Sequence, residues 1–402
     1  MAGPLEGFRV VELGVWVAGP SAGGILADWG AEVVKIEPPD GGDPFRGMYL
    51  AVAGAELPAN PPFELDNRGK RSVALNLQTP EGRALALALI DRADVFLTNI
   101  RPAALRRLGL DWPDLQARNP RLVYGRVTGY GEDGPDADRP SYDIGAFWSR
   151  SGIAAALAPP DGDPPFQRGA MGDHTAGMTL AGGISAALLA RERNGQGQLV
   201  TTSLLRVGVY VLGWDTNAAL RLGIQATPMT RDYTPNPVIS AYKAGCGRWF
   251  WLLGLQGQRH WPDLVRAIDK PEWLTDPRFA TMRARREHVR ELVPLLDALF
   301  AERARDEWGA AFDRAGMWWA PVQTVNEVVD DPQAAAAGAW VDVPVAEGGT
   351  ARMVASPVDF SATRWAPAGA SPECGQHTEE VLLELGCDWE RIGALKEAGI
   401  IP

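Results

Sequence analysis

The sequence predicts an α/β fold built on a parallel sheet, and the order of strand-like and helical patterns leads to this prediction. Residues 8–13 and 31–37 are apolar runs typical of buried strands, and residues 21–29 between them have a helical pattern. Further strand-like runs follow at 93–98 and 122–127, again separated by helical stretches. Strands that alternate with helices along a chain favour a sheet whose neighbouring strands run parallel.

The pattern changes near Ala226, which indicates a second domain. Residues 231–320 contain a strand pair with Gly245–Arg248 as its turn, followed by several amphipathic helices. These features predict a smaller α+β domain over 231–320. After Pro321 helices and strands resume.

The composition excludes several classes of function. The 402 residues include 39 Lys and Arg against 50 Asp and Glu, a net charge of −11, so we expect no nucleic-acid or anionic-membrane partner. The three cysteines have no C-x-x-C spacing and the four histidines form no H-x-x-x-H pair, so we expect no metal site and a reducing compartment. No run approaches the ~18 apolar residues of a membrane span, and the first residues lack a signal-peptide pattern, so we expect a cytoplasmic protein.

One carboxylate, Asp173, is a candidate reactive group. It lies between glycines in the segment Gly169–Met178, directly before an apolar helical pattern that ends near Gly195. We therefore expect Asp173 at or near a helix N-terminus, where unpaired N–H groups and the helix dipole favour the ionised carboxylate. The neighbouring glycines leave room for a substrate to approach. The alternative is that Asp173 only caps the helix, as Asp commonly does.

A cluster of arginines is a candidate phosphate site in this acidic chain. Arg101, Arg106 and Arg107 lie beside the start of a helix expected near Pro102. A solvated helix face is the alternative. Residues 38–69 are rich in Gly, Pro and Asp and are expected to form a long ordered loop at the strand ends, where open α/β sheets bind ligands.

A nicotinamide dehydrogenase is an alternative from another class of enzyme. The first β-α-β unit ends in an acidic residue, Glu37, which in dinucleotide-binding folds holds a ribose hydroxyl. The loop 14–20 argues against this alternative, because Trp16 and Val17 occupy positions where the backbone would have to approach a pyrophosphate.

Several further motifs occur in a fixed order along nearly the whole chain, and their order and spacing together are specific. They are Gly7–Leu13, Ala18–Pro20, Leu26–Glu37, Asn67–Ser72, Thr79–Gly82, Ala93–Asn99, Gly129–Gly131, Gly172–Gly177, Gly195–Gln198 and Gly375–Thr378. In this order they resemble the class III CoA-transferase family, whose relatives include formyl-CoA transferase, carnitine CoA-transferase and α-methylacyl-CoA racemase.

The resemblance implies a Rossmann-like large domain formed by both chain ends, a small inserted domain, and two ring-shaped subunits interlocked as a homodimer. On this basis 1–205 is the N-terminal part of the large CoA-binding domain, 206–230 a linker helix, and 321–402 the return segment that completes the large domain. Asp173 matches the family's catalytic aspartate. The positions that match CoA contacts are Leu75, Asn76, Leu77, Gln78, Asn99, Ile100, Arg101, Arg107, Tyr142 and Asp143.

The chemistry implied by the resemblance is CoA transfer from an acyl-CoA to a carboxylic acid, with coenzyme A as a substrate moiety and without a permanently bound cofactor. Asp173 would attack the thioester carbonyl to form a mixed anhydride, and the freed CoA thiolate would then give an aspartyl-CoA thioester. Backbone N–H groups of two glycine-containing loops are candidates for stabilising the oxyanions. These are the N–H groups of Val17, Ala18 and Gly19 in one loop and of Gly172 and His174 in the other.

The racemase branch of the family is the alternative activity. Its acid/base His precedes the Asp-Ile pair that here is Asp143-Ile144, and Tyr142 occupies that position. A tyrosine with a pKa near 10 is a poor base at neutral pH, so racemisation is disfavoured. His174 beside Asp173 is another candidate base, although it can equally be a residue that only begins the helix.

The identity of the acid stays open, because the chain departs from formyl-CoA transferase at two places. Pro38 replaces a basic residue, and the glycine-rich loop of the small domain has no counterpart in the sequence pattern. We expect an acyl pocket around Trp148, Tyr242 or Trp249, whose aromatic lining would suit a larger or more apolar acid than oxalate. Burial in a core explains Trp249 equally well.

Overall fold

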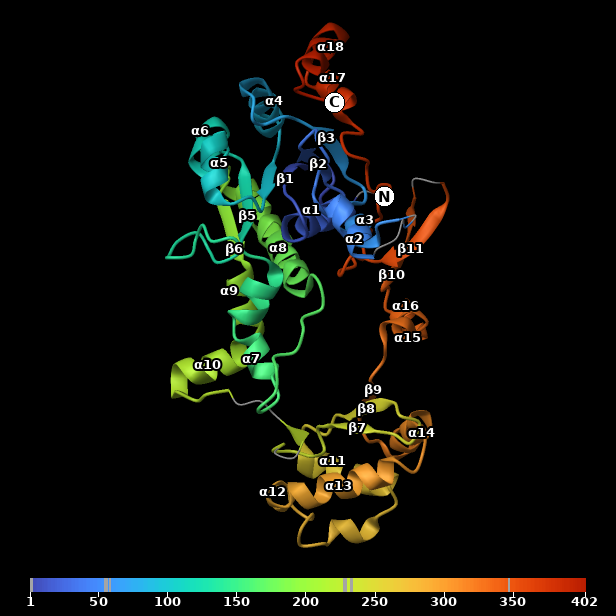
Figure 1. Cartoon of the computed structure of the whole chain (residues 1–402). Helices are drawn as coiled ribbons and strands as arrows, with labels where there is room; N and C mark the ends of the chain where they lie inside the picture. Colours follow the sequence, from blue (N-terminus) through green and yellow to red (C-terminus); the bar gives the residue numbers. More distant parts are fainter. Residues whose placement is uncertain (1–2, 54–56, 58, 227–229, 232–233, 346–347) are drawn as a thin grey trace. The chain divides into compact units, whose positions relative to one another are not determined.

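The computed structural model describes residues 3–53, 57, 59–226, 230–231, 234–345 and 348–402. The chain forms two compact units (Figure 1). The large unit comprises Met1–Ala155, Pro165–Ala226 and Gly338–Pro402. The small unit comprises Ala156–Pro164 and Thr227–Ala337.

The large unit is organised around a six-stranded sheet in which all neighbouring strands are parallel. The strand order is β3-β2-β1-β4-β5-β6, so the chain begins in the middle, builds outward to β3 and returns to the other side of β1. The predicted parallel α/β fold is confirmed. Such sheets bind ligands outside the carboxyl ends of the strands, where the order reverses, here between β1 and β4. The strands are β1 (Arg9–Leu13), β2 (Glu32–Glu37), β3 (Arg71–Ala74), β4 (Val95–Thr98), β5 (Val123–Thr128) and β6 (Leu199–Ser203).

Helices cover both faces of this sheet, which explains why its strands are apolar on both sides. On one face α1 and α8 pack over Val10 and Leu97. On the other face α4, α5, α6 and the C-terminal helices α17 and α18 pack over Val11 and Phe96. The helices are α1 (Ala18–Asp28), α4 (Pro80–Asp91), α5 (Pro102–Leu108), α6 (Trp112–Arg118), α8 (Met171–Asn194), α17 (Thr378–Glu384) and α18 (Trp389–Glu397).

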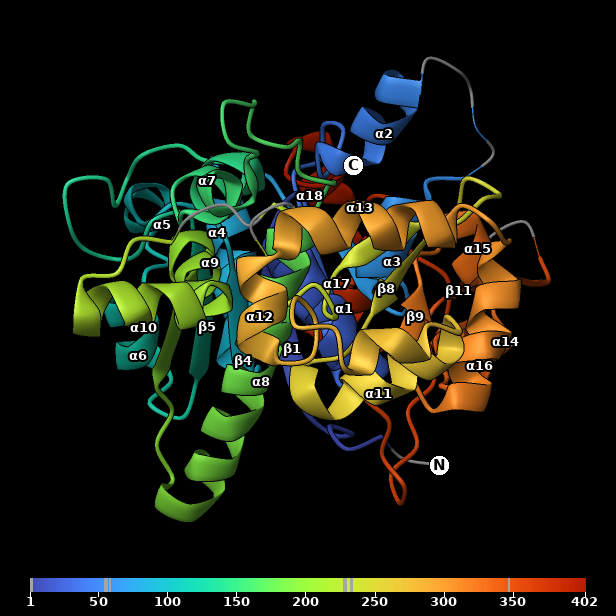
Figure 2. The same cartoon turned by 90° about the horizontal axis from the view of Figure 1, so that it is seen from below.

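The helices α1 and α8 approach each other closely, because small residues meet at their contact (Figure 2). A Cβ atom on Gly177 of α8 would overlap the Ser21 hydroxyl of α1. A Cβ atom on Gly23 of α1 would overlap a carboxylate oxygen of Glu12 in β1. Glycine alone lacks the Cβ atom that would prevent these approaches. The approach at Gly177 holds the N-terminal part of α8, which contains Asp173, against α1.

The prediction of a long loop over 38–69 is wrong, because two helices lie there. They are α2 (Phe45–Ala53) and α3 (Pro61–Asn67). The start of α3 carries a recognisable signal, since Asn60 caps the helix with its side chain and a proline follows at the first helical position. Residues 54–56 and 58 of this segment lie outside the described residues.

The helical segments on either side of α8 are shorter than expected. The segment expected to form a linker helix over 206–230 contains two helices separated at Leu212, α9 (Leu204–Val211) and α10 (Gly213–Leu222). The stretch after Asp143 forms a π-helix and then a short α-helix. These are Ile144–Ser149 and α7 (Ile153–Leu157).

The small unit has its own aromatic core. An antiparallel sheet of order β7-β8-β9 packs with α11, α13 and α14 around this core. The predicted strand pair with its turn at 245–248 is confirmed. The elements are β7 (Ala241–Lys243), β8 (Trp249–Leu252), β9 (Trp319–Pro321), α11 (Gly257–Ala267), a 3-10 helix Pro271–Leu274, α12 (Met282–Glu287), α13 (Val289–Phe300), α14 (Arg305–Ala315), α15 (Val325–Val329) and α16 (Pro332–Ala336).

The return of the chain to the large unit begins with a pair of antiparallel strands. They are β10 (Trp340–Pro344) and β11 (Thr350–Val354). Residues 346–347 between them lie outside the described residues. Within the described part of the chain, no helix is both long and apolar enough to cross a membrane.

Candidate active site

The loops after β1 and β4 meet where the strand order reverses, and Asn99 holds them together. Its side chain accepts the Val15 N–H at 3.0 Å and donates to the Val15 carbonyl at 2.7 Å. The Thr98 hydroxyl donates to the Leu13 carbonyl at 2.7 Å. The loop over 14–17 is therefore fixed to the neighbouring strand before any ligand arrives.

The start of α1 offers backbone donors at this edge of the sheet. Val17 precedes the helix and Ala18 and Gly19 open it, where helix geometry leaves N–H groups without an intrahelical acceptor. Within the described residues these three N–H groups have no hydrogen-bond partner. The N–H groups of Gly172 and His174 are already engaged, by a side-chain carboxylate and a backbone carbonyl respectively. Of the two predicted oxyanion loops, the first therefore has the free donors.

Asp173 is the third residue of α8 and does not cap this helix. The helix starts after Ala170, which has a left-handed backbone at φ 63° and supplies no side-chain cap. The side chain of Asp173 is half-buried. Among the described residues it has no hydrogen-bond or ion-pair partner. The alternative in which Asp173 serves only as an N-cap is therefore wrong, although its place in the first helical turn is as predicted.

Two further carboxylates and one imidazole surround Asp173. Asp143 accepts the Gly172 N–H at 3.0 Å, and its second oxygen is buried without a partner among the described residues. The His174 Nε2 lies 3.1 Å from the buried Asp66 carboxylate. Burial, followed by the negative charge of Asp143, raises the pKa of Asp173 to about 7, and His174 opposes this only in part. Burial therefore acts against the ionised state that the helix N-terminus favours.

The His174–Asp66 pair is a feature that the sequence analysis missed. Burial disfavours the charged imidazole, but the hydrogen bond and the charge of Asp66 outweigh this and raise the pKa of His174. The two residues are 108 positions apart, and no motif connects them. Only the packing of α3 against α1, and of α1 against α8, brings them together.

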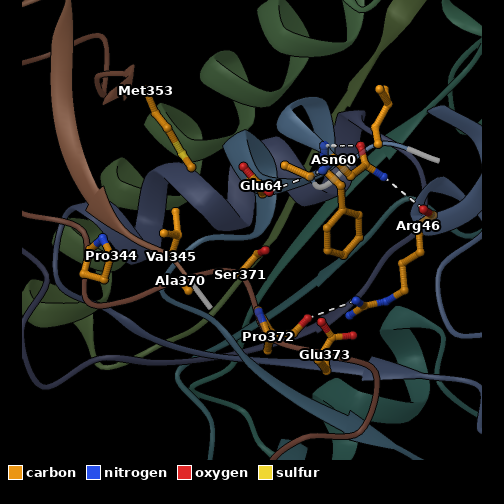
Figure 3. Close-up of a pocket in the computed structure, with 13 residues that line it drawn as sticks. Arg46, Asn60, Glu64, Pro344, Val345, Met353, Ala370, Ser371, Pro372 and Glu373 are labelled. Atoms are coloured by element: carbon orange, nitrogen blue, oxygen red, sulfur yellow. Dashed lines mark hydrogen bonds between the residues drawn. The ribbon is translucent and has the colours of Figure 1, made fainter. Parts of the chain in front are cut away.

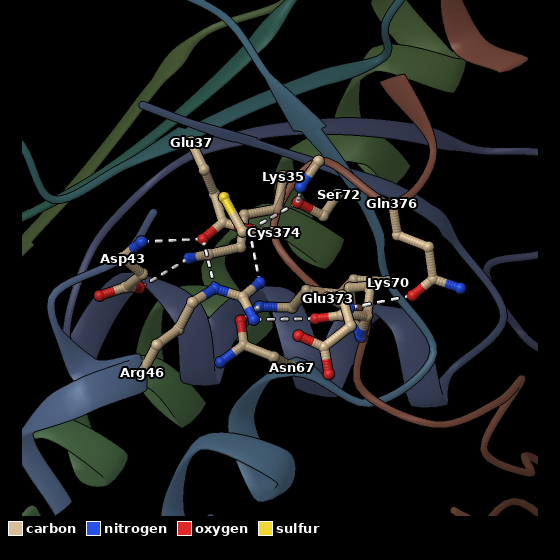
Figure 4. Close-up of polar contacts among 12 residues, drawn as sticks. Lys35, Glu37, Asp43, Arg46, Asn67, Lys70, Ser72, Glu373, Cys374 and Gln376 are labelled. Atoms are coloured by element: carbon tan, nitrogen blue, oxygen red, sulfur yellow. Dashed lines mark hydrogen bonds and ion pairs between the residues drawn. The ribbon is translucent and has the colours of Figure 1, made fainter. Parts of the chain in front are cut away.

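A second group of charges, the buried ion cluster, consists of Glu12, Lys35, Asp43 and Lys70. Glu12 bridges the two lysines, with its oxygens 2.9 Å from the Lys35 Nζ and 2.7 Å from the Lys70 Nζ. Lys35 also lies 3.0 Å from Asp43 (Figure 4). All four side chains are fully buried. Each carboxylate in this cluster faces an ammonium group.

Glu37, at the end of β2, is occupied by partners from the same unit. Its oxygens accept bonds from Arg46 at 2.6 and 2.8 Å and from the Ser72 hydroxyl at 2.6 Å (Figure 4). The Asp43 N–H adds a bond at 2.8 Å. A ribose hydroxyl would have to displace this network, so the geometry argues against the dehydrogenase alternative.

Two cavities of the large unit border these groups. The first, of about 270 Å³, is lined by Arg46, Asn60 and Glu64 on one side and by residues 370–373 on the other (Figure 3). Across it, Arg46 donates to the Pro372 carbonyl at 2.9 Å. The second, of about 180 Å³, is bordered by the His174–Asp66 pair and is mostly apolar. Within the described residues no three His, Cys, Asp or Glu side chains are grouped as metal ligands.

The comparison with protein families decides the identity of the chain. The model of CoA-transferase family III matches residues 5–378. The chain belongs to CoA-transferase family III. The resemblance predicted from the motifs is thereby confirmed, and the protein is an enzyme of this family.

Curated relatives match the CoA-transferase over nearly its full length. The (R)-2-hydroxy-4-methylpentanoate CoA-transferase of Clostridioides difficile is 33% identical over 99% of both chains. The cinnamoyl-CoA:phenyllactate CoA-transferase of Clostridium sporogenes is 33% identical over 98% of this chain and 96% of its own. A crystal structure of a CAIB/BAIF family protein from Brucella suis has a TM-score of 0.84 at 31% identity, covering 96% of this chain and 100% of that one.

The residues predicted to bind CoA lie at the carboxyl edge of the enzyme's sheet. They differ in how far their side chains are buried or already hydrogen-bonded. Arg101 makes one long bond, at 3.4 Å, to the Asp138 carbonyl, and Arg107 has no ion-pair partner among the described residues. The Asn99 side chain holds the loop before α1 through its two hydrogen bonds to Val15, which we call the Asn99 clamp, and Ile100 follows it in the chain. The segment 75–78, which contains Leu75, Asn76, Leu77 and Gln78, leaves the end of β3, and Leu75 itself is buried.

The last two residues predicted to bind CoA differ from each other. The ring of Tyr142 is 66% exposed, which leaves it accessible to a ligand. Asp143 is buried, and its carboxylate already supports the start of α8.

The aromatic residues expected around the acyl pocket are mostly core residues of the CoA-transferase. Trp148 is buried in the large unit, where its indole N–H donates to the Pro165 carbonyl at 2.9 Å. Tyr242 is fully buried in the core of the small unit. Trp249 alone is exposed, at 38%. The expectation is therefore wrong for Trp148 and Tyr242, and the aromatic group near Asp173 is a different one.

Proposed function

We propose that the enzyme moves CoA from an acyl-CoA thioester to a carboxylic acid, with Asp173 as the covalent carrier. The observation that carries this proposal is the state of Asp173: a half-buried carboxylate in the first turn of α8 that has no partner within the described part of the chain. The residue that precedes α8, Ala170, packs against a small cluster of Val17, Phe45 and Phe63, and Val17 belongs to the loop before α1. The unpaired carboxylate and the free N–H groups of the first loop are therefore close neighbours.

The proposed reaction consists of two acyl exchanges on Asp173. A carboxylate oxygen attacks the thioester carbonyl, the C–S bond breaks, and CoA leaves as a thiolate from a mixed anhydride. The thiolate then attacks the aspartyl carbonyl and releases the first acid as its carboxylate. The second acid enters by the reverse of these steps, so the cycle needs no net proton transfer. Covalent catalysis thus divides one difficult exchange into easier ones.

Each step passes through an oxyanion, and the N–H groups of Val17, Ala18 and Gly19 are the proposed donors. Their direction is fixed in advance, because the Asn99 clamp holds the loop before α1. Such preorganised donors stabilise charge that appears only in the transition state.

We propose that the phosphates of CoA bind along α5, between Arg101, which precedes its first turn, and Arg107 in its last turn. Arg107 is exposed and has no ion-pair partner among the described residues. Arg101 is also exposed and makes one long hydrogen bond to a backbone carbonyl. In a chain with a net charge of −11, such free cations at the ligand-binding edge of the sheet favour an anionic ligand. Asn99, Ile100 and residues 75–78 would contact the remainder of the nucleotide.

We propose that two copies of the chain form the predicted interlocked homodimer. The edge strand β6 borders a large groove between α8, α9 and α10, and apolar side chains around it are exposed. Monomers rarely expose apolar surface of this extent. The exposed side chains are Leu189, Tyr210, Val211, Trp214, Leu220 and Leu222.

One alternative function has a specific observation in its favour. The His174–Asp66 pair supplies a base and an orienting carboxylate beside Asp173, as proton transfer at the α-carbon of an acyl-CoA would require. Racemisation predicts exchange of the α-hydrogen of a 2-methylacyl-CoA with deuterated water. CoA transfer predicts no such exchange.

The test of the proposed function is the intact mass of the enzyme after brief incubation with a panel of acyl-CoAs. We expect a CoA-sized covalent adduct on the wild-type chain, sensitive to hydroxylamine, and none on Asp173→Ala. The variant Asp163→Ala, an exposed aspartate in the loop before α8, is the matched control and should form the adduct normally. A wild-type chain that forms no adduct with any donor would contradict the proposal.

A further inference from the structure

Two residues near Asp173 have a backbone conformation that is unfavourable for their side chains. Trp16 and Ala170 have φ angles of 64° and 63°, and they directly precede the turns that open α1 and α8. This left-handed region brings the Cβ atom of a residue too close to the following carbonyl oxygen and is therefore unfavourable. Such strain is retained where the surrounding structure requires it, which is often at functional sites.

The side chains at these two positions pack against the same apolar cluster, which contains two phenylalanines. Trp16 and Ala170 pack against Val17, Phe45 and Phe63. The Trp16 ring lies 6.3 Å from the Phe45 ring at an interplanar angle of 55°. The backbone N–H of Trp16 also donates to the Asp43 carboxylate at 3.0 Å. The position of the indole is thereby determined by the core beneath it.

The outer side of the Trp16 ring meets Tyr142. Their centroids are 5.9 Å apart and the rings are nearly perpendicular, at 87°. Tyr142 is 66% exposed, so this pair extends the aromatic group from the core to the surface. We call Trp16, Phe45 and Tyr142 the aromatic wall.

The aromatic wall is joined to the reactive carboxylate at two points. Ala170 packs against the same Val17, Phe45 and Phe63 cluster as Trp16, and it stands three residues before Asp173. Asp143, which follows Tyr142, accepts the N–H of Gly172. Both ends of the wall are thus attached to the first turn of α8, beside the carboxylate that would receive the acyl group.

The basic groups nearest to the aromatic wall are mostly neutralised. Lys35 is fully buried between carboxylates, and Arg46 is bound to Glu37 and to a backbone carbonyl (Figure 4). His174 faces Asp66. Arg168, five residues before Asp173 in the loop before α8, is exposed. A second carboxylate on the substrate would therefore depend on Arg168.

We propose that the aromatic wall receives the side chain of the transferred acid and selects monocarboxylic acids with an aromatic or branched apolar side chain. The inference rests on the proposed function, because it assumes that acyl groups are transferred at Asp173. It assigns to Trp16 a specificity role that no motif of the family indicates. The half-buried Trp16 ring, held by the core behind it, and the exposed Tyr142 ring offer contact area at little entropic cost.

The experiment uses identity exchange, so neither natural substrate needs to be known. Each acyl-CoA is incubated with its own free acid labelled with carbon-13, and the entry of label into the thioester is followed by mass spectrometry. The acids are 3-phenylpropanoate, 4-methylpentanoate, acetate and succinate. We expect wild-type kcat/KM to be highest for the first two acids.

The decisive variant is Trp16→Gly, because glycine adopts the left-handed backbone without strain and removes the ring. We expect its preference for 3-phenylpropanoate over acetate to fall by about tenfold, the scale of discrimination in apolar pockets. Tyr142→Ala, at an exposed position, should lower the preference in the same direction. Asp161→Gly, which relieves a similar φ of 60° outside the wall, and Trp389→Ala, which removes an exposed indole from α18, should leave the preference unchanged.

Two outcomes would overturn the inference while leaving the proposed function intact. The first is that Trp16→Gly and Tyr142→Ala slow exchange of all four acids by the same factor, which would make the wall purely structural. The second is that succinate exchanges fastest and that Arg168→Met removes this preference, which would indicate a dicarboxylic substrate. Failure of the proposed function gives a different result, since wild type would then exchange no acid at all.

Discussion

The buried ion cluster and the surroundings of Asp173 lie in the same unit, and they differ in whether their carboxylates are paired with cations. In the cluster, Glu12 and Asp43 face two ammonium groups at 2.7 to 3.0 Å, and none of the side chains is exposed. Around Asp173, by contrast, the single imidazole is paired with Asp66, Asp143 accepts a backbone N–H, and Asp173 itself has no partner among the described residues.

This difference separates charges that hold the fold from charges that are available for chemistry. A buried ion pair is costly to form, but breaking it by removing one partner leaves an uncompensated charge. An unpaired carboxylate with a raised pKa costs stability and remains free to react. Substitutions in the buried ion cluster should therefore lower stability more than activity, and substitutions around Asp173 should lower activity more than stability.

The largest effect expected is the loss of CoA transfer in Asp173→Asn. Removing a covalent carrier should lower kcat by about 10⁴-fold or more. Stability should not fall with it, because an acid whose folded pKa is raised to about 7 opposes folding once the pH exceeds its unfolded pKa. We expect urea unfolding to show a gain in stability of the order of 1 kcal/mol at pH 8 that disappears near pH 4. A loss of stability at pH 8 would show that the carboxylate supports the fold.

The reverse pattern is expected for Glu12→Gln, which leaves two buried lysines short of a counter-charge. Breaking a buried pair of this kind costs about 3–5 kcal/mol. The measurement is the free energy of unfolding in urea, with Glu390→Gln, an exposed glutamate on α18, as the control. A loss of less than about 1 kcal/mol in the free energy of unfolding would mean that the cluster relaxes around the substitution. The cluster would then not differ from the surroundings of Asp173 in its contribution to stability.

An intermediate effect is expected on the pH profile of adduct formation. Wild-type adduct formation should rise with pH through about 7, because Asp173 must lose its proton to attack. Asp143→Asn removes a neighbouring negative charge, so the midpoint should move to lower pH, by the order of one unit. His174→Gln removes the opposing positive charge and should move it to higher pH, with Asp66 left in place in both variants. Identical midpoints in all three proteins would contradict the electrostatic coupling.

The smallest effect is expected where charges are exposed. Arg107→Ala should weaken the binding of free CoA by about 3- to 10-fold, since an exposed ionic contact contributes about 1 kcal/mol. The loss should shrink as salt is added. Arg193→Ala, an exposed arginine at the far end of α8, is the matched control in calorimetric titration. Equal affinities for wild type and Arg107→Ala would place the phosphates elsewhere.

The local features of the fold could be predicted from the sequence. The strands and their helices follow from apolar runs, and the positions of β1, β2, β4 and β5 agree with the predicted ones within a few residues. The helices α2 and α3 were missed because glycines and prolines dominate the segment 38–69. The cap at Asn60 was nevertheless a signal that could have been used.

The candidate site was less predictable, because its electrostatics depend on distant residues. Asp173 was accessible to prediction through its glycines and the helix that follows. Asp66 comes within 3.1 Å of His174 only through the packing of three helices. Lys35 and Lys70 have the sequence pattern of surface residues, and nothing local reveals that both are fully buried around Glu12. Burial decides the pKa values here, and burial is a property of the whole fold.

The close contact between α1 and α8 has a consequence for how this sequence can vary. Gly23 leaves no space for a methyl group beside Glu12, and Gly177 leaves none beside Ser21. Neither glycine has a side chain that a substrate can contact, yet alanine at either position would displace the buried charges or the helix that presents Asp173. In a library of random variants, active enzymes should lack substitutions at these two glycines as strongly as at the reactive aspartate itself. Tolerance to substitution alone would therefore not distinguish residues that set the helix spacing from residues that take part in the reaction.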